Sequence, residues 1–536
     1  MKKFFHYLLL SVAMVVTFTA CSDDDDPYFQ LPETLQGKAV TIISNGNNLS
    51  DAQCIYSLGA DHKTVTLNIF GTAAGKAEAA SDVPAIAPGY ILPGCADVTL
   101  TFAPEITETG ASYEGQGTST YCTYTYRVTF TEAAVTVEFK DIVMNSGLIL
   151  SEITYTDSDV DHMLELTYNG APMMGKIVKY APAENEYDKA VITLSGATLD
   201  LTDMLETVSA SLPLDLSKLK TIPTPGVFPG SVSTDLTITI GSDGSFSGQG
   251  ETEFLTFKYS GTATASKMAL NITEATLKNT AIAGTWNPVP FAIEDDWDSP
   301  NYGMPISNPI KFEWISDAPI DMGSGTQIPT ILVGHLLSIM PIIPSEDTQL
   351  TIPQMLNKAL KSVTFQPDGN IVAEYVPKAL STNPAVTSPV NLAHYVVKSD
   401  GEVLVFLNPQ AIIMAVMSEG SKSRADGNLD LGQFQSIIDA LAPTLLNMVQ
   451  NGAPLQYTHA GDDLSIFLGT EVLKPLLQAI IPVCQNQEVL EALKAMVDQN
   501  MAGMGDLVKN AMASLPAVIN GTTKLEAGIN FQKAAQ

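Results

Sequence analysis

The chain has 536 residues, of which 27 are Lys or Arg and 58 are Asp or Glu, so its formal net charge is −31 at pH 7. Arg127 and Arg424 are its only arginines. Binding to nucleic acid and to anionic lipid surfaces rests on Lys and Arg, so this composition argues against both as partners. The length predicts about three domains.

The N-terminus has the pattern of an export signal. Lys2 and Lys3 precede an apolar run over residues 8–18, and Phe18-Thr-Ala-Cys21 closes it. A basic start, a short apolar segment and small residues before the cut are typical of a secretory signal. Because a Cys follows the cut, we expect residues 1–20 to be a lipoprotein signal peptide and Cys21 to carry the lipid. The alternative is an ordinary signal with an incidental Cys.

An acidic tether is expected next, over residues 21–33. Residues 23–26 are four consecutive aspartates, and runs of like charge stay solvated. No later stretch reaches the roughly 18 apolar residues that a spanning helix needs. We therefore expect attachment to the outer membrane through the lipid, at the cell surface, with the periplasmic face as the alternative. The acidic run could equally be a spacer without export meaning.

The sequence does not decide whether the four further cysteines are oxidised or free. Cys54, Cys95 and Cys122 lie in the first β-rich region, and Cys484 lies near the C-terminus. One disulfide among the first three is compatible with an oxidising compartment, but buried free thiols are the favoured interpretation. The absence of a Cys-x-x-Cys pair in the sequence argues against a zinc site.

A repeat of 133 residues organises the first half of the chain. Gly-Gln-Gly occurs at residues 115–117 and again at residues 248–250. The same offset aligns two sets of alternating side chains, each with the spacing of one strand face. The matched residues are Cys122, Tyr124 and Tyr126 with Leu255, Phe257 and Tyr259, and Val135, Val137 and Phe139 with Met268, Leu270 and Ile272. The sequence therefore predicts a duplicated β-domain.

Each copy is predicted to consist of short antiparallel strands. The strands are rich in Thr, Val, Ile and Tyr, and the Asp243-Gly244 pair favours a tight hairpin turn. We place the copies at residues 34–150 and 151–283. About 130 residues of this character fit either an eight-stranded barrel or a two-sheet sandwich.

This pattern of aliphatic strand, Asp-Gly turn, Gly-rich step and second aliphatic strand resembles the calycin-like lipoproteins of Bacteroidota. The resemblance covers residues 31–283 well and the remainder loosely. It implies a lipocalin-like barrel. It brings no activity and no catalytic residues.

The C-terminal part, residues 284–536, is expected to be an α+β domain. Hairpins are predicted over residues 363–375 and 395–406, and a helix over residues 431–449 with a kink at Pro443. A second helix should begin after Asn486. The hairpins echo those of the two copies, so this domain is a candidate degenerate third copy with helical insertions. The fold class is thus mainly β, with two tandem antiparallel barrels or sandwiches followed by an α+β domain.

Catalytic and metal-binding constellations are missing from the sequence. The histidines of the mature chain lie far apart, and no nucleophile elbow, phosphate loop or dinucleotide fingerprint occurs. Residues 157–161, Asp-Ser-Asp-Val-Asp, begin like a calcium loop, but His162 stands where the loop requires Gly. We interpret this stretch as a solvated interdomain linker. We expect no enzyme activity, no cofactor and no metal.

The tryptophans form the one candidate binding cluster. All three lie between Trp286 and Trp314, in a stretch rich in Pro and Asp. Exposed aromatic rings beside carboxylates can stack on sugars, which makes Trp297 and Tyr302 the candidate binding residues. The alternative is packing at a domain junction, because large aromatics dominate buried seams. We expect burial for Trp286 and Trp314, and Trp297 should be at least partly exposed if this stretch is a binding site.

Three functions compete. The first is a non-enzymatic binding or accessory module for a glycan or small apolar ligand, with the barrel mouths as default pockets and an outer-membrane protein as a further candidate partner. The second is a structural or adhesive lipoprotein of fimbrial type. The third, a hydrolase, has no pair of carboxylates that can be named. The sequence favours the first.

Overall fold

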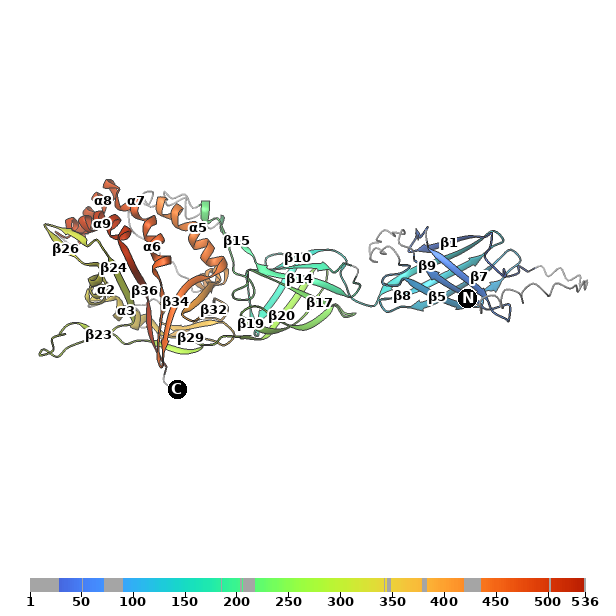
Figure 1. The fold of residues 1–536 in the computed structure, drawn as a ribbon, viewed down its shortest axis with the longest axis horizontal. Helices are drawn as coiled ribbons and strands as arrows, with labels where there is room; N and C mark the ends of the chain where they lie inside the picture. The colour runs from blue at the N-terminus through green and yellow to red at the C-terminus, as the bar shows by residue number, and fades with distance from the viewer. Residues whose placement is uncertain are drawn as a thin grey trace, which may run out of the picture. The chain divides into compact units, whose positions relative to one another are not determined.

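The computed structural model describes residues 28–534, except 51, 72–89, 185, 203–204, 206–216, 342, 345–348, 378–382, 419–434 and 501–502. The chain divides into two compact units, residues 1–145 and 146–536. The first unit contains the first β-domain. The second unit contains the second β-domain and the C-terminal domain (Figure 1).

The first β-domain consists of two sheets. One has the order β2-β1-β9-β8-β7-β6 and the other has the order β3-β4-β5. Its strands are β1 Ala39–Ser44, β2 Asn47–Asn48, β3 Gln53–Leu58, β4 Val65–Phe70, β5 Asp97–Phe102, β6 Glu105–Ile106, β7 Ala111–Thr118, β8 Cys122–Phe130 and β9 Ala134–Met144. All neighbours are antiparallel except β1 and β9, which run parallel. The alternating burial along β8 and β9 puts one face of each strand into the core.

The second β-domain is a nearly closed barrel. Its sheet has the order β17-β14-β13-β10-β11-β20-β19-β18, with β12 beside β11. The strands at the two ends, β17 and β18, are consecutive in sequence, and Gly241 N donates to Ser245 O (2.7 Å) between them. Its strands are β10 Ile153–Thr156, β11 Met163–Tyr168, β12 Ala171–Pro172, β13 Lys176–Pro182, β14 Lys189–Gly196, β17 Ser233–Thr239, β18 Ser245–Glu251, β19 Leu255–Ala263 and β20 Lys267–Leu277.

The predicted duplication is confirmed strand by strand. Strands β8 and β9 shifted by 133 residues coincide with β19 and β20 at both ends. Tyr124 and Phe257 are both buried, as are Phe139 and Ile272. The copies even share an irregularity: Asp141 and Glu274, also 133 residues apart, both have positive φ, 49° and 52°. The pairing register shifts beside each of them, which marks the same β-bulge in both copies.

The Gly-Gln-Gly motif has a packing role. In each copy its two glycines lie opposite aromatic residues of the next strand, and those rings cover the glycines. The pairs are Gly115 with Tyr126, Gly117 with Tyr124, Gly248 with Tyr259, and Gly250 with Phe257. A Cβ at any of these glycines would come within 2.8 Å of the partner's ring or hydroxyl. Glycine is therefore required by the close approach of the rings.

One strand distinguishes the two copies. In the second copy β10 pairs with β13 and touches β11, and so joins the two halves of the barrel. In the first copy residues 29–38 form no strand. Pro32 lies in that segment, and its carbonyl accepts a hydrogen bond from the Tyr56 hydroxyl (2.6 Å). The first copy is consequently an open sandwich and the second a nearly closed barrel, so both predicted alternatives occur.

The C-terminal domain is α+β, as predicted. Its sheet has the order β31-β30-β29-β21-β36-β35-β34-β33-β32, with β24 also beside β36. All its pairs are antiparallel, unlike in the two copies; the third copy stays a prediction. The strands are β21 Gly284–Pro288, β24 Ile310–Ser316, β29 Leu360–Phe365, β30 Ile371–Tyr375, β31 Val386–Thr387, β32 Ala393–Ser399, β33 Glu402–Leu407, β34 Ala453–Ala460, β35 Asp463–Leu468 and β36 Thr522–Lys533.

Helices accompany this sheet, several of them along one side of it (Figure 1). They are α2 Val333–Ile339, α3 Ile352–Ala359, α4 Pro409–Ser418, α5 Gln435–Asn451, α6 Thr470–Ala479, α7 Ile481–Cys484, α8 Gln487–Asn500 and α9 Gly505–Asn520. Two predictions are confirmed here. Helix α5 is the helix predicted over residues 431–449, although residues 431–434 lie outside the described residues and the kink at Pro443 stays a prediction. The Asn486 side chain accepts hydrogen bonds from the first amides of α8 (3.0 and 3.4 Å).

Candidate functional site

The predicted binding residues lie on a two-stranded tongue of the C-terminal domain. Strands β22 (Ala292–Ile293) and β23 (Pro305–Ser307) form its base, and the segment between them projects from the rest of the second unit (Figure 1). Two backbone hydrogen bonds close the tip, from Glu294 N to Met304 O and from Gly303 N to Glu294 O, both 2.9 Å. Gly303 has a φ of +79°, so the turn back into β23 favours glycine there.

Trp297 and Tyr302 meet at the tip of this tongue. Trp297 is 78% exposed and Tyr302 is 51% exposed. Their ring centroids are 4.9 Å apart and the rings are inclined by 64°, an edge-to-face arrangement. Such a pair is favourable because the positive edge of one ring meets the negative face of the other. The structure thus brings both predicted residues together at the surface.

The tongue is negatively charged. Glu294, Asp295, Asp296 and Asp298 surround Trp297 in sequence, and no Lys, Arg or His occurs between Lys278 and Lys311. Two of the acids also bind the backbone: Asp298 N donates to Asp296 Oδ1 (3.0 Å) and Asp296 N to Glu294 Oε1 (3.2 Å). The tip therefore offers hydrogen-bond acceptors next to an aromatic surface.

The other two tryptophans are buried, as predicted. Trp286 donates from Nε1 to Ile282 O (2.9 Å), and its ring meets the His459 ring edge-on. Trp314 donates to the Thr522 hydroxyl (2.9 Å). Packing in a core explains these two residues, and Trp297 is the one that solvent reaches.

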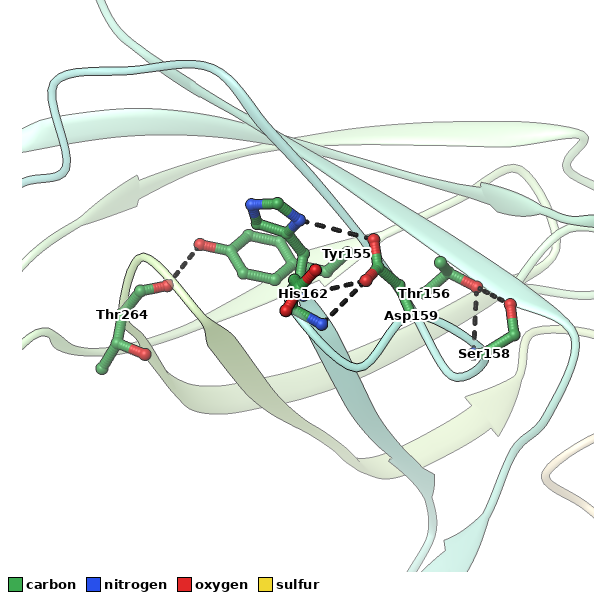
Figure 2. A network of polar contacts seen from close by, with 7 residues as sticks. Tyr155, Thr156, Ser158, Asp159, His162 and Thr264 are labelled. Carbon is green, nitrogen blue, oxygen red and sulfur yellow. Dashed lines mark hydrogen bonds and ion pairs between the residues drawn. The ribbon is translucent and has the colours of Figure 1, made fainter.

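Residues 157–161 form the β10–β11 turn within the second barrel, so the interpretation as an interdomain linker is wrong. The Asp159 carboxylate accepts hydrogen bonds from Asp161 N (2.8 Å) and His162 N (3.2 Å). Figure 2 shows Asp159 beside His162. These bonds lower the pKa of Asp159, the one from Asp161 most. Nearby, the Tyr155 hydroxyl donates to Thr264 O (2.6 Å) and ties this end of the barrel to the β19–β20 turn (Figure 2).

A buried lysine lies where the second barrel meets the C-terminal domain. Lys176, at the start of β13, donates from Nζ to Pro225 O (2.7 Å) and Gly226 O (3.2 Å). Burial lowers its pKa to about 7, and the nearby Asp157 opposes that shift. Asp157 itself bridges the two domains, because it accepts from Gly175 N of the barrel (2.8 Å) and from Gln410 Nε2 of α4 (3.2 Å).

His394 faces the same seam from strand β32. Its ring meets the Tyr168 ring edge-on at 5.5 Å, and its Nε2 is buried without a hydrogen-bond partner among the described residues. Burial above all, and then the charge of Lys176, lower its pKa to about 3. Asp368 adds a further link, since its carbonyl accepts from the Tyr168 hydroxyl (2.7 Å) and its carboxylate from Asn169 Nδ2 (3.1 Å).

The sequence did not predict this seam. One signal was available: Lys176, Val178 and Tyr180 alternate along one strand, so a lysine shares the face of two core residues. Nothing in the sequence pointed to its partners, which are main-chain carbonyls 49 and 50 residues away.

The interior of the second barrel is filled by its own side chains. Tyr155, Tyr168, Tyr180 and Phe228 are fully buried there, and Phe228 stacks on Phe257 with centroids 4.0 Å apart. Hollows occur on the outer face of the barrel instead, over strands β18 to β20. These hollows therefore do not lie at the barrel mouth, which was the expected default pocket.

The remaining expectations concern single residues. Cys54, Cys95, Cys122 and Cys484 are free thiols; Cys122 and Cys484 are buried, as favoured, whereas Cys54 and Cys95 are only half-buried. Burial raises the pKa of Cys54 to about 11. Within the described ranges no group of three His, Cys, Asp or Glu side chains is arranged to hold a metal ion. Cys21 and residues 23–26 lie outside the described residues. Of the helices in the described part of the chain, none is both long and apolar enough to cross a membrane.

Comparison with models of protein families gives no match for this chain, and comparison with curated proteins gives none either. The resemblance to calycin-like lipoproteins therefore rests on the residues quoted for it.

Proposed function

We propose that this chain is a non-enzymatic lipoprotein of the outer membrane that binds a glycan through Trp297 and Tyr302, at the tip of its tongue. The lipid on Cys21 would hold the protein at the membrane, and the acidic residues 23–26 would keep its domains in solution, at the cell surface.

The exposure of Trp297 is the observation that carries the binding role. Tryptophan is costly to leave in water, and 78% of this side chain is exposed although the chain buries both of its other tryptophans. The edge-to-face contact with Tyr302 holds the indole without covering it. A rigid aromatic surface in water is what a planar or ring-shaped ligand requires.

The charge around the tip favours a sugar over other ligands. Four carboxylates near Trp297 would repel phosphate and acidic glycans. They would also accept hydrogen bonds from the hydroxyl groups of a neutral sugar whose ring stacks on the indole. A purely apolar ligand would leave these carboxylates to be desolvated without partners, at a cost in free energy.

A glycan microarray probed with the full chain in detergent tests the binding role. We expect signal on neutral glycans, and in Trp297→Ala a loss of signal on those glycans that the tongue binds, because that change removes the stacking surface. Ile306→Ala is the matched control, since Ile306 is 62% exposed on the same tongue but has no ring. Equal signal from Trp297→Ala and the wild type would refute the tongue as the binding site.

The anchor has its own test. Cys21→Ala should abolish labelling by a palmitate analogue and release the protein from membranes into the soluble fraction. Membrane association that persists in this variant would contradict the lipoprotein assignment, whatever the glycan array shows.

A further inference from the structure

A row of hollows follows the outer face of the second barrel. The first, of about 670 Å³, contains Ser247, Ser260 and Asn271 in its lining. The second, of about 400 Å³, shares Ser247 and Ser260 with the first, and the third, of about 490 Å³, shares Gln249 and Lys258 with the second. The three hollows therefore form one groove along strands β18 and β19.

The first β-domain shows how this groove arises. The residues that correspond to Ser247, Ser260 and Asn271, at the offset of 133, are Glu114, Arg127 and Glu138. In both copies these three positions lie side by side across three neighbouring strands.

The two copies differ in how these positions are filled. In the first copy, the Arg127 guanidinium lies 3.8 Å from the Glu114 carboxylate, and the Lys140 ammonium lies 3.3 Å from the same carboxylate. Lys140 corresponds to Thr273, so in the second copy four long charged side chains are replaced by Ser, Ser, Asn and Thr. Short hydroxyl and amide side chains leave open the space that paired charges occupy in the duplicate.

We propose that this groove of the second β-domain is a second carbohydrate site, which takes a neutral oligosaccharide lying along strands β18 and β19. The proposal deepens the proposed glycan-binding role and rests on it, but it concerns other residues and is tested separately.

The lining selects the class of ligand. Ser247, Ser260, Thr262 and Thr273 offer hydroxyl groups that both donate and accept, and Gln249 adds an amide. Such groups pair with the hydroxyls of a sugar without needing a charge on the ligand. Lys258 is the one cation that lines these three hollows. It already contacts Glu274 (2.8 Å), so it offers little to an acidic polymer.

An extended peptide fits this groove less well. Recognition of a peptide strand relies on free backbone groups at a sheet edge. Strand β19 is paired with β18 on one side and β20 on the other, so its backbone groups are already used, and only the edge of β18 that ends the sheet is left for a peptide strand. Over β19 the groove therefore meets its ligand mainly through side chains, which suits a carbohydrate.

The first copy supplies the test variant. Ser247→Glu combined with Ser260→Arg places the ion pair of the first copy across the groove. The duplicate already carries this pair on the same two strands, so we expect the melting temperature to stay close to that of the wild type. Ser260→Arg alone is the second variant, in case the double change fails to fold. Thr154→Glu is the control, because it adds a charge opposite Lys179 on strands β10 and β13, outside the groove.

Binding is measured by isothermal titration calorimetry of the full chain in detergent, with cellohexaose, xylohexaose, maltohexaose and mannohexaose as probes. Hexagalacturonate and a Ser-Gly hexapeptide are the acidic and peptide comparisons. All measurements are made in the Trp297→Ala background, so that binding at the tongue does not contribute. We expect at least one neutral hexaose to bind, at least tenfold weaker binding after the groove is filled, and no change with Thr154→Glu.

Three results would overturn the groove proposal: no neutral hexaose bound by Trp297→Ala, unchanged affinity in the filled variants, or preference for the hexapeptide. Failure of the proposed binding role of the tongue would give a different result, because Trp297→Ala would then bind glycans as the wild type does.

Discussion

At the scale of single residues, the pairing of glycine with an aromatic ring explains the most visible motif of the chain. Because Gly250 has no side chain, the Phe257 ring packs directly against it. The same ring is also fixed by stacking on Phe228. Glycine is usually unfavourable in a strand, because it packs poorly and loses much conformational freedom. Here the buried ring offsets that cost.

Gly250→Ala should therefore destabilise the second unit. The new Cβ would lie 2.6 Å from Phe257 Cζ, and the stacked ring cannot move without disturbing the core. We expect a loss of about 1–3 kcal/mol in the free energy of unfolding, typical of overpacking. Urea denaturation measures it, with the outward-facing Ser247→Ala as control. Equal stability of Gly250→Ala and the control would contradict this packing account.

Lys176 should make stability depend on pH. Its pKa is about 7 in the folded protein and about 10.4 in an unfolded chain, so between these values the unfolded state binds more protons. The free energy of unfolding should consequently rise with pH above 7 and fall as the pH drops through 7. His394 acts with the same sign in acid, since its folded pKa is about 3.

Lys176→Met tests this sign. Denaturation of both proteins from pH 6.5 to 9 should show a stability difference, wild type minus variant, that grows in favour of the wild type as pH rises. A difference that is constant, or that shrinks with rising pH, would show that the amine does not lose its proton on folding.

At the scale of elements, the repeat made strands β8, β9, β19 and β20 predictable. The offset of 133 residues aligns β19 and β20 with β8 and β9, because the alternation of buried and exposed side chains and the β-bulge both depend on local sequence. The β10 strand and the parallel pairing of β1 with β9 could not be predicted in this way. Both depend on where a distant segment crosses the sheet, and residues 29–38 and 153–156 share no pattern.

Two asparagines hold the second barrel and the C-terminal domain together. Asn391 Nδ2 donates to Pro172 O (3.0 Å), and Asn408 Nδ2 donates to Met174 O (2.9 Å). Both asparagines are buried. Each amide thus donates to a main-chain carbonyl of the barrel across the seam.

Removing both amides should uncouple the two domains. Asn391→Ala with Asn408→Ala leaves buried carbonyls unpaired, at about 1–3 kcal/mol each. We expect differential scanning calorimetry to show the transition of the second unit lowered or split in two. Asn301→Ala, on the tongue, is the control. A single transition at the wild-type temperature would show that the apolar core of the seam suffices.

At the scale of the whole molecule, the candidate site was predictable only in part. Trp297 and Tyr302 could be named because aromatic and acidic residues cluster within a few positions of the chain. The burial of Trp286 and Trp314 was expected, but the exposure of Trp297 and its contact with Tyr302 depend on the tongue that carries them, which the sequence does not reveal. The groove on β18 and β19 arises from differences between the copies at positions more than ten residues apart, which only the aligned strands reveal.

Quenching of tryptophan fluorescence tests the central claim most directly, because only Trp297 of the three tryptophans is exposed. Acrylamide should quench one component of the emission strongly, and Trp297→Phe should lack that component. Saturation with the glycan that gives the strongest microarray signal should protect the wild type down to the level of Trp297→Phe, since the stacked sugar covers the indole. Undiminished quenching at saturation, with binding still measurable, would contradict glycan binding at the tongue.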